Sequence, residues 1–401
     1  MKKEGREGKE RKDLDFKTKV VHVGNGVDKE TGVIKRPITM GNSYRLPYDP
    51  TDINWSSTDG NLYTRNGGSN QKYLENRLSS ITNSEDTIAF ASGVGALSAL
   101  FFSMLTNKDH VIFSNITYIA TYRLLNELFN NKFGVETTII DTTNIKYVES
   151  AIRPNTKLIH IETPGNPIIS ISDISAIAKL AHEKGILLSV DNTLASPYNQ
   201  KPLDLGADFS IESLTKYING HGDSMGGSIS GKKEYLDKIR QQAQLNIGAV
   251  ISPFNAWLIM RGSTTLALRM EQHNKNGLKI AKYLETVDSI KFVSYPGLKS
   301  HVGHEIAKSQ MSPGFGGVLS FALNGDQDTH NQFVDNLKLI TSAVSLGHDE
   351  SLIVFIGKDD ERQYLYPKEF NNGFFRLSVG IEDVDDLIND INQALNSVGL
   401  F

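Results

Sequence analysis

Cysteine is absent from the sequence, and its absence removes several kinds of chemistry at once. Disulfides, thiolate zinc ligands and a cysteine nucleophile are all excluded. Long apolar runs are lacking too, and none approaches the length needed to cross a bilayer. We therefore expect no metal site and no membrane partner.

An excess of charge of one sign is also missing. The formal net charge is -4, and no basic stripe lies outside the N-terminal tail, so we expect no nucleic-acid partner. That tail, residues 1–13, mixes six basic with four acidic residues and has no apolar stretch. Such a composition is typical of a solvated tail and not of a signal peptide, so the expected location is cytoplasmic.

What the chain does contain is enough apolar sequence for two cores, since 39% of its 401 residues are hydrophobic. Between about residues 87 and 232, short apolar runs alternate with amphipathic segments. This pattern predicts an α/β fold with a mostly parallel sheet covered by helices, among them 94–105 and 173–185. The expected strands are 87–92, 110–114, 135–141, 157–163, 186–192 and 208–213.

A smaller α/β domain is expected in the last third of the chain. Residues 253–285 predict one long helix or two, followed by strands in "GGVLSFALN" and "FFRLSVG" and a closing helix in "VDDLINDINQALNSV". Residues 14–75 show little periodicity, which favours an arm onto a neighbouring subunit over a simple surface wrap. The expected division is an arm at 1–64, a large domain at 65–253 and a C-terminal domain at 254–401.

Small and hydroxyl residues follow two of the predicted strands, where ligands of an open α/β sheet bind. Ser92, Gly93 and Val94 open a helix whose bare N–H groups would favour a phosphate, although a small turn for close packing is at least as common. Ser213 and Thr215 would add hydroxyl donors to the same phosphate or serve ordinary turns.

Asp191 and Lys216 form a more specific pair. Asp191 follows the apolar run "ILLSV", so burial would raise its pKa unless a cation such as a pyridinium lies beside it; a helix N-cap is the alternative. Lys216 alone indicates either a surface lysine or a nucleophile for carbonyl chemistry. Together, an aspartate for a pyridine nitrogen and a lysine for an aldehyde are what pyridoxal phosphate (PLP) requires.

The segment "VDNTLASPYNQKPLDLGADFSIESLTKYINGHGDSMGG" (190–227) closely resembles the cofactor-binding segment of the PLP enzymes of cysteine and methionine metabolism, the cystathionine γ-synthase/γ-lyase family. The resemblance extends over residues 60–395. It implies a fold-type I PLP-dependent transferase with a mostly parallel seven-stranded sheet. It also implies that Lys216 forms a Schiff base with the cofactor and that Asp191 and Thr193 contact it.

The same resemblance implies roles for residues elsewhere. Tyr63 and Arg65 look like the pair that the family gives to the cofactor phosphate of the adjacent subunit, which implies a dimer with shared sites and, by family habit, a tetramer. Tyr118 looks like the tyrosine that stacks on the pyridine ring and acts near the leaving group.

Substrate contacts are implied as well. Arg376 resembles the arginine that clamps the substrate α-carboxylate bidentately, and Asn166 the asparagine near the phenolic oxygen of the cofactor. Arg123, Ser345 and Glu350 resemble residues on the substrate side. Each alone would be an ordinary packing or surface residue, but their joint occurrence at matching spacings favours the site.

Three segments depart from the family pattern. Ile119 and Ala120 stand where two glycines are common, "NGGSNQ" follows Arg65, and "VFIGKDDERQYLYP" (354–367) replaces the usual His-Pro and Thr-His elements. These changes imply an altered substrate preference. The lack of a cysteine after Tyr118 counts against strict methionine specialisation.

The implied activity is that of a PLP-dependent carbon–sulfur lyase, which eliminates the γ-substituent of cystathionine, methionine or homocysteine to give a 2-oxo acid, ammonia and a thiol. A γ-replacement synthase, either a cystathionine γ-synthase or an O-acylhomoserine sulfhydrylase, is the nearest alternative. β-Elimination and transamination remain open on fold grounds. A catalytically silent PLP-fold binding protein is disfavoured because Asp191, Lys216, Tyr118 and Arg376 are all present.

Overall fold

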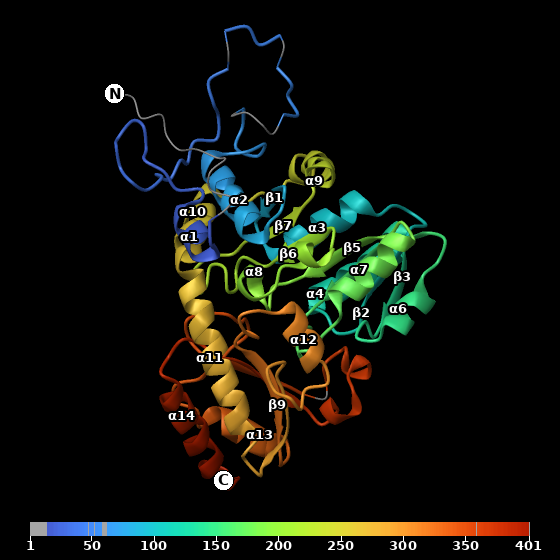
Figure 1. Cartoon of the computed structure of the whole chain (residues 1–401), viewed down its shortest axis with the longest axis vertical. Coiled ribbons are helices and arrows are strands. Elements are labelled where there is room, and N and C mark those ends of the chain that lie inside the picture. The colour runs from blue at the N-terminus through green and yellow to red at the C-terminus, as the bar shows by residue number, and fades with distance from the viewer. Residues whose placement is uncertain (1–13, 47, 52, 58–61, 358, 401) are drawn as a thin grey trace.

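The protein is arranged around two sheets that lie one above the other (Figure 1). The computed structural model describes residues 14–46, 48–51, 53–57, 62–357 and 359–400. A long helix, α11 (Leu266–Leu284), runs beside both regions in the view of Figure 1. In these described ranges no helix combines the length and the apolar character needed to cross a membrane.

The larger sheet has the strand order β1-β7-β6-β5-β4-β2-β3. Strand β7 pairs antiparallel with β1 and β6, and the remaining pairs are parallel, as predicted. The six predicted strands are present, but β7 was missed because its sequence GSISG lacks an apolar run. The strands are β1 (Asp86–Phe90), β2 (His110–Ser114), β3 (Glu136–Ile140), β4 (Thr156–Glu162), β5 (Leu187–Asp191), β6 (Phe209–Glu212) and β7 (Gly227–Gly231).

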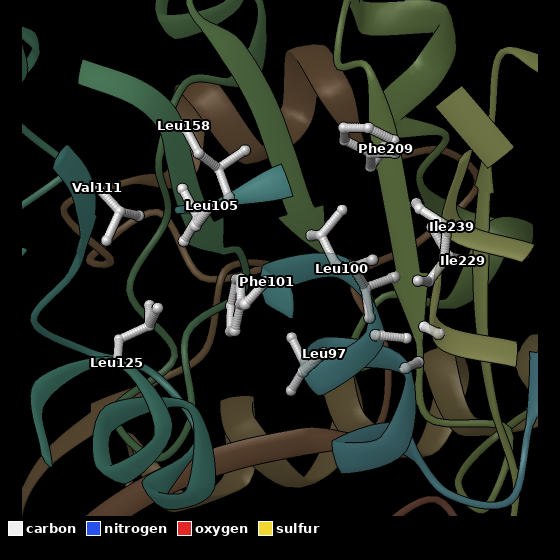
Figure 2. Packing of buried hydrophobic residues seen from close by; sticks show 14 of the residues in the cluster. Leu97, Leu100, Phe101, Leu105, Val111, Leu125, Leu158, Phe209, Ile229 and Ile239 are labelled. Carbon is white, nitrogen blue, oxygen red and sulfur yellow. The ribbon is translucent and has the colours of Figure 1, made fainter. Parts of the chain in front are cut away.

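Helix α3 (Gly93–Met104) anchors the first strand end to this sheet. Its buried residues Leu97, Leu100 and Phe101 share a hydrophobic cluster with Phe209 and Ile229 of the sheet (Figure 2). Fully burying a side chain of this size stabilises the fold by about 1.5–3 kcal/mol. The N-terminus of α3 is therefore held firmly at the edge where the strands end.

The C-terminal region contains a second sheet with the order β10-β11-β12-β9-β8. Residues 253–285 form two helices, α10 and α11, separated by a 3-10 turn. The predicted strands and closing helix of this region appear as β9, β12 and α14, whereas β8, β10 and β11 were not predicted. The bounds are α10 (Pro253–Gly262), β8 (Ile290–Ser294), β9 (Val318–Leu323), β10 (Thr341–Ser342), β11 (Leu352–Ile356), β12 (Phe374–Ser378) and α14 (Val384–Ser397).

Residues 14–75 contain more regular structure than expected, namely α1 (Phe16–His22) and the start of α2 (Ser69–Thr82). Val20 and Leu74 are buried in one cluster with α10, so both helices belong to the core. The blue loop between them extends away from the sheets (Figure 1). The remaining helices are α4 (Ile119–Tyr122), α5 (Asn130–Phe133), α6 (Ile145–Ala151), α7 (Ile174–Glu183), α8 (Ser196–Asn199), α9 (Lys233–Ile239), α12 (His304–Gln310) and α13 (Gln327–Asp335).

Candidate active site

Five strand ends bring the predicted residues to one edge of the larger sheet. Strands β2, β4, β5 and β6 are parallel, and β1 has the same direction because both β1 and β6 pair antiparallel with β7. The residues that follow these ends are Ser92 after β1, Tyr118 after β2, Asn166 after β4, Thr193 after β5 and Lys216 after β6.

Lys216 lies in the turn after β6 and faces the C-terminal region. Its Nζ donates a hydrogen bond to Ser345 Oγ at 2.6 Å, and that oxygen lies 3.1 Å from Nε2 of His348. Burial, assisted by the positive charge of Arg376, lowers the pKa of Lys216 to about 8. A substantial fraction of this amine is therefore neutral near physiological pH, as nucleophilic attack on a carbonyl requires.

Asp191 ends β5 and is only 6% exposed. The N–H and the hydroxyl of Thr193 donate to its Oδ1 at 3.1 and 2.6 Å. Burial raises the pKa of Asp191 in spite of these bonds, so a neighbouring cation would favour its charged form. The next helix, α8, has Ala195 at its N-cap, so Asp191 does not cap it and the pyridinium role is the better fit.

Two further buried carboxyl groups, which were not predicted from the sequence, lie at this edge. Glu162 is paired with Asp191 across β4 and β5. It accepts hydrogen bonds from the N–H groups of Tyr118 at 2.6 Å and Asn166 at 2.9 Å. Burial, followed by the charge of Asp191, raises the pKa of Glu162 to about 8, and burial also raises that of Glu212. Both end an apolar strand in the sequence, which is the pattern that singled out Asp191.

Arg376, on β12, closes the site from the second sheet. Its Nη1 donates to Asn166 Oδ1 at 2.9 Å and its Nη2 to the Ser345 carbonyl at 2.7 Å. Within the described chain, Nε of Arg376 is buried and has no hydrogen-bond partner. A guanidinium with a buried, unbonded N–H is suited to bind a substrate carboxylate, which would accept a hydrogen bond from Nε of Arg376.

The start of α3 forms the candidate phosphate cradle. Ser92 caps this helix, since its Oγ accepts a backbone N–H of the first turn at 3.0 Å. A Cβ on Gly93 would lie 2.9 Å from Cβ of Ser213, so glycine allows this close approach, and Val94 follows in the first turn. The Thr215 hydroxyl exchanges hydrogen bonds with the backbone of the glycine-rich tail, which agrees with its turn alternative.

The residues expected on the substrate side are more exposed. Tyr118 precedes α4 and is 42% exposed. Arg123 forms an ion pair with Glu361 at 2.5 Å, a partner that the sequence did not suggest. Glu350 is exposed and lies in the loop that also carries Ser345.

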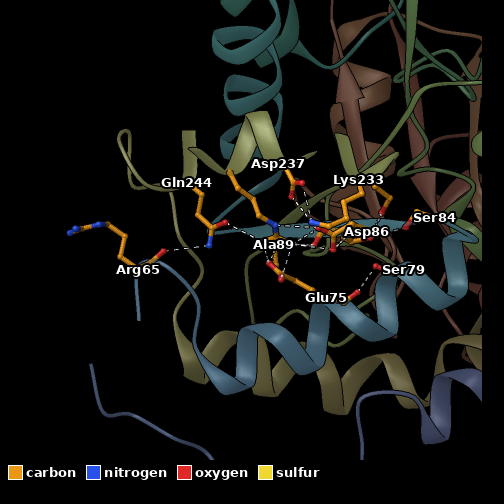
Figure 3. A network of polar contacts seen from close by, with 12 residues as sticks. Arg65, Glu75, Ser79, Ser84, Asp86, Ala89, Lys233, Asp237 and Gln244 are labelled. Carbon is orange, nitrogen blue, oxygen red and sulfur yellow. Dashed lines mark hydrogen bonds and ion pairs between the residues drawn. The ribbon is translucent and has the colours of Figure 1, made fainter. Parts of the chain in front are cut away.

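Tyr63 and Arg65 lie on the N-terminal side of the molecule. Both are exposed, and the Arg65 guanidinium is 5.2 Å from the centre of the Tyr63 ring. Gln244 donates to the Arg65 carbonyl at 3.4 Å and is itself bonded to Arg240, which pairs with the buried Glu75. The side chain of Arg65 points away from this network (Figure 3), and its role in the site of another subunit stays a prediction.

This fold and this site define a PLP-dependent enzyme acting on an amino acid. A buried carboxyl for a ring nitrogen, a lysine amine of lowered pKa and a small-residue helix start fit the three polar parts of PLP. When bound, PLP supplies a sink for the electron pair left at Cα. The roles expected from the sequence, Lys216 for the Cα proton and Arg376 for the α-carboxylate, stay predictions with which these contacts agree. Across the described residues, no cluster of three or more acidic or histidine side chains could hold a metal ion.

The chain belongs to the Cys/Met metabolism PLP-dependent enzyme family, whose sequence profile matches residues 17–396. Canavanine γ-lyases of Pseudomonas canavaninivorans and Rhizobium leguminosarum bv. trifolii are each 49% identical over 96% of this chain and 96% of their own length. Cystathionine γ-lyase of Bacillus subtilis is 39% identical over 95% of this chain and 99% of its own. The structure of metB from Corynebacterium glutamicum has a TM-score of 0.90 at 38% identity, covering 97% of this chain and 100% of that one.

These similarities confirm the predicted family, fold type and PLP cofactor. They also confirm the predicted class, a PLP-dependent lyase, and the relatives named for cystathionine and methionine support the carbon–sulfur lyase interpretation. The reaction type that the γ-lyase relatives share is γ-elimination, so the synthase alternative is not favoured.

Proposed function

We propose that this protein is a γ-lyase whose main substrate is L-canavanine, an amino acid with a guanidinooxy group on Cγ. The observation that carries the proposal is that one site holds both Lys216, whose pKa is about 8, and Arg376, whose buried Nε has no hydrogen-bond partner among the described residues. The substrate choice is supported by the two canavanine γ-lyases at 49% identity, against 39% for a cystathionine γ-lyase. Cystathionine, the first choice from the sequence, becomes the second candidate.

In this proposal each residue has a defined task. Arg376 binds the α-carboxylate and Lys216 removes the proton from Cα. A second proton must leave Cβ before the electron pair can expel the oxygen on Cγ. Tyr118, which is partly exposed, would protonate the departing oxygen. Hydroxyguanidine leaves, and one water is consumed whether the four-carbon remainder ends as 2-oxobutanoate and ammonia or as homoserine.

The test is a kcat/KM comparison on the purified holoenzyme. Canavanine, cystathionine, methionine, homocysteine and O-acetylhomoserine would each be supplied with and without an added thiol. We expect the highest kcat/KM for canavanine, with release of hydroxyguanidine. A higher value for cystathionine would replace the proposed substrate, and thioether formation at the expense of elimination would replace the proposed reaction.

L-Arginine provides the matched control because a methylene replaces the oxygen that canavanine carries on Cγ. It has the same shape but no leaving group at this position. It should therefore bind without any four-carbon product being formed. Release of such a product from arginine would contradict γ-elimination as the source of the signal.

A further inference from the structure

The segment that departs most from the family pattern packs against the helix start that carries Tyr118. We call residues 359–366 the docking segment. Arg362 donates to the Thr117 carbonyl at 2.6 Å, and the hydroxyls of Tyr364 and Tyr122 are 2.9 Å apart. These contacts lie on both sides of Tyr118 in the sequence, so the docking segment forms part of the wall beside the candidate substrate position.

In the docking segment Arg362 is a buried anchor, whereas the neighbouring Glu361 is partly exposed. Arg362 is 6% exposed, and its Nε and Nη2 donate to the Asp360 carboxylate at 3.2 and 3.1 Å. Glu361 follows Asp360 directly and contacts Arg123 at 2.5 Å, with side chains 40% and 57% exposed. The buried anchor therefore holds Glu361 in place while the ion pair itself stays partly exposed to solvent.

The ion pair between Arg123 and Glu361 changes which γ-substituents this wall of the site can attract. An unpaired Arg123 would draw a carboxylate at the far end of a substrate towards Tyr118. Cystathionine carries such a distal carboxylate, whereas the guanidinooxy group of canavanine carries none. With Glu361 in contact, a distal carboxylate can bind Arg123 only by displacing the Glu361 carboxylate.

We propose that Glu361 is a specificity-determining residue that neutralises Arg123 and thereby selects against γ-substituents ending in a carboxylate. The inference rests on the proposed function and deepens it, because it gives a physical reason for the preference of canavanine over cystathionine. Among the described residues Glu361 is bonded to Arg123 and not to Lys216 or the candidate cofactor residues, so we assign its effect to Arg123.

Glu361→Gln in the holoenzyme removes the charge from a partly exposed side chain. The ratio of kcat/KM for cystathionine to that for canavanine should rise about fivefold, the scale of one exposed ion pair. Asp359→Asn is the matched control, since it removes the same charge from the same segment and leaves the Arg123 contact intact. An unchanged ratio in Glu361→Gln, or an equal rise in Asp359→Asn, would overturn the assignment.

A double variant tests whether Glu361 acts through Arg123. In an Arg123→Met background, Glu361→Gln should leave the substrate ratio unchanged, because the cation that it neutralises is gone. A rise of the same size in both backgrounds would show that Glu361 acts on the substrate or on another group, and would contradict the proposal.

Binding of unreactive analogues separates this inference from the proposed function. L-Arginine mimics canavanine, and LL-2,7-diaminosuberate mimics cystathionine with a methylene in place of sulfur. Their Kd values can be measured from the change in cofactor absorbance without turnover. Glu361→Gln should tighten diaminosuberate relative to arginine about fivefold even if neither parent substrate is consumed. No change in the Kd ratio would overturn the role of Glu361, whereas absent turnover alone would overturn only the proposed function.

Discussion

In the proposed mechanism the chemistry depends on the amine of Lys216, and the surroundings of this amine set the pH at which it can react. Burial is the main cause that lowers its pKa to about 8, and Arg376 adds to it. Below that pH the amine is protonated and cannot attack an aldehyde; above it the neutral form dominates. An ordinary lysine would need a pH above 10 for the same condition.

The first prediction follows from that pKa. Cofactor-free protein should recombine with PLP at a rate that rises with pH, with a midpoint near 8, measured by the appearance of the Schiff-base absorbance. Lys216→Ala should give no such band. Lys201→Ala is the control, because burial also lowers the pKa of Lys201 although it lies outside the site. A midpoint near the ordinary lysine value would contradict the account.

Glu162 carries the second prediction at this scale. Its carboxyl accepts hydrogen bonds from the backbone N–H groups of both Tyr118 and Asn166. In Glu162→Gln the side-chain NH2 group, itself a donor, would face one of these N–H donors. We expect kcat to fall about tenfold to a hundredfold with PLP still bound, as loss of buried hydrogen bonds costs about 1–3 kcal/mol. In Glu212→Gln, which affects a carboxyl bonded to Asn192 instead, the fall should be smaller. Unchanged kcat in Glu162→Gln would remove its positioning role.

Site residues were predictable where a local pattern or a family motif marks them. Asp191 and Lys216 follow apolar strands, and the structure brings them to one edge as expected. The contact between Lys216 and Ser345 joins residues 129 positions apart, and only the folded chain shows it. The same holds for the pairing of Arg123 with Glu361, since neither residue lies in a pattern that indicates the other.

Some secondary-structure elements were predictable from the sequence and others were not. Helix α7 begins where the sequence predicts, because Asp173 caps it by accepting the Ala176 N–H at 2.9 Å. Helix α2 was missed although Leu74, Leu78 and Ile81 have helical spacing and are fully buried, since polar residues surround them. Strand β7 has no comparable pattern, and its place is fixed by pairing with β1 and β6.

Strand β7 carries the third prediction because it passes very close to the candidate phosphate cradle. A Cβ on Gly227 would lie 2.1 Å from the Ser92 carbonyl oxygen. Gly227→Ala should therefore displace the start of α3, lower stability by about 1–3 kcal/mol and weaken PLP binding. Thermal unfolding and the Kd for PLP would measure both effects. Gly357→Ala, whose added Cβ would have its nearest contact at 3.5 Å, should change neither; a Gly227→Ala protein with unchanged PLP affinity would contradict the cradle.

At the scale of the whole molecule, the loop between α1 and α2 presents apolar side chains to solvent. Ile34, Met40 and Trp55 are 76%, 63% and 66% exposed. Apolar groups gathered on one extended segment agree with the prediction that another subunit covers this surface, which stays a prediction. Tyr63 and Arg65 follow directly on this loop, so the same contact would deliver them to a neighbouring site.

The fourth prediction concerns that shared site. Arg65→Ala and Lys216→Ala should each be inactive, but random hybrids place both changes in one site and leave the other intact. Mixed subunits should then recover about a quarter of the wild-type activity, since half of the dimers are hybrids with one good site of two. Verified hybrids without recovered activity would show that Arg65 serves the site of its own chain.

The most direct test of the central claim is the isotope content of the product formed from L-canavanine in D2O by the holoenzyme. Expulsion of a group from Cγ requires a proton to leave Cβ and another to return from solvent. The account predicts that hydroxyguanidine is released and that the four-carbon product contains solvent deuterium at Cβ. The Lys216→Ala variant should form neither hydroxyguanidine nor the deuterated product. A four-carbon product with no deuterium at Cβ would contradict γ-elimination.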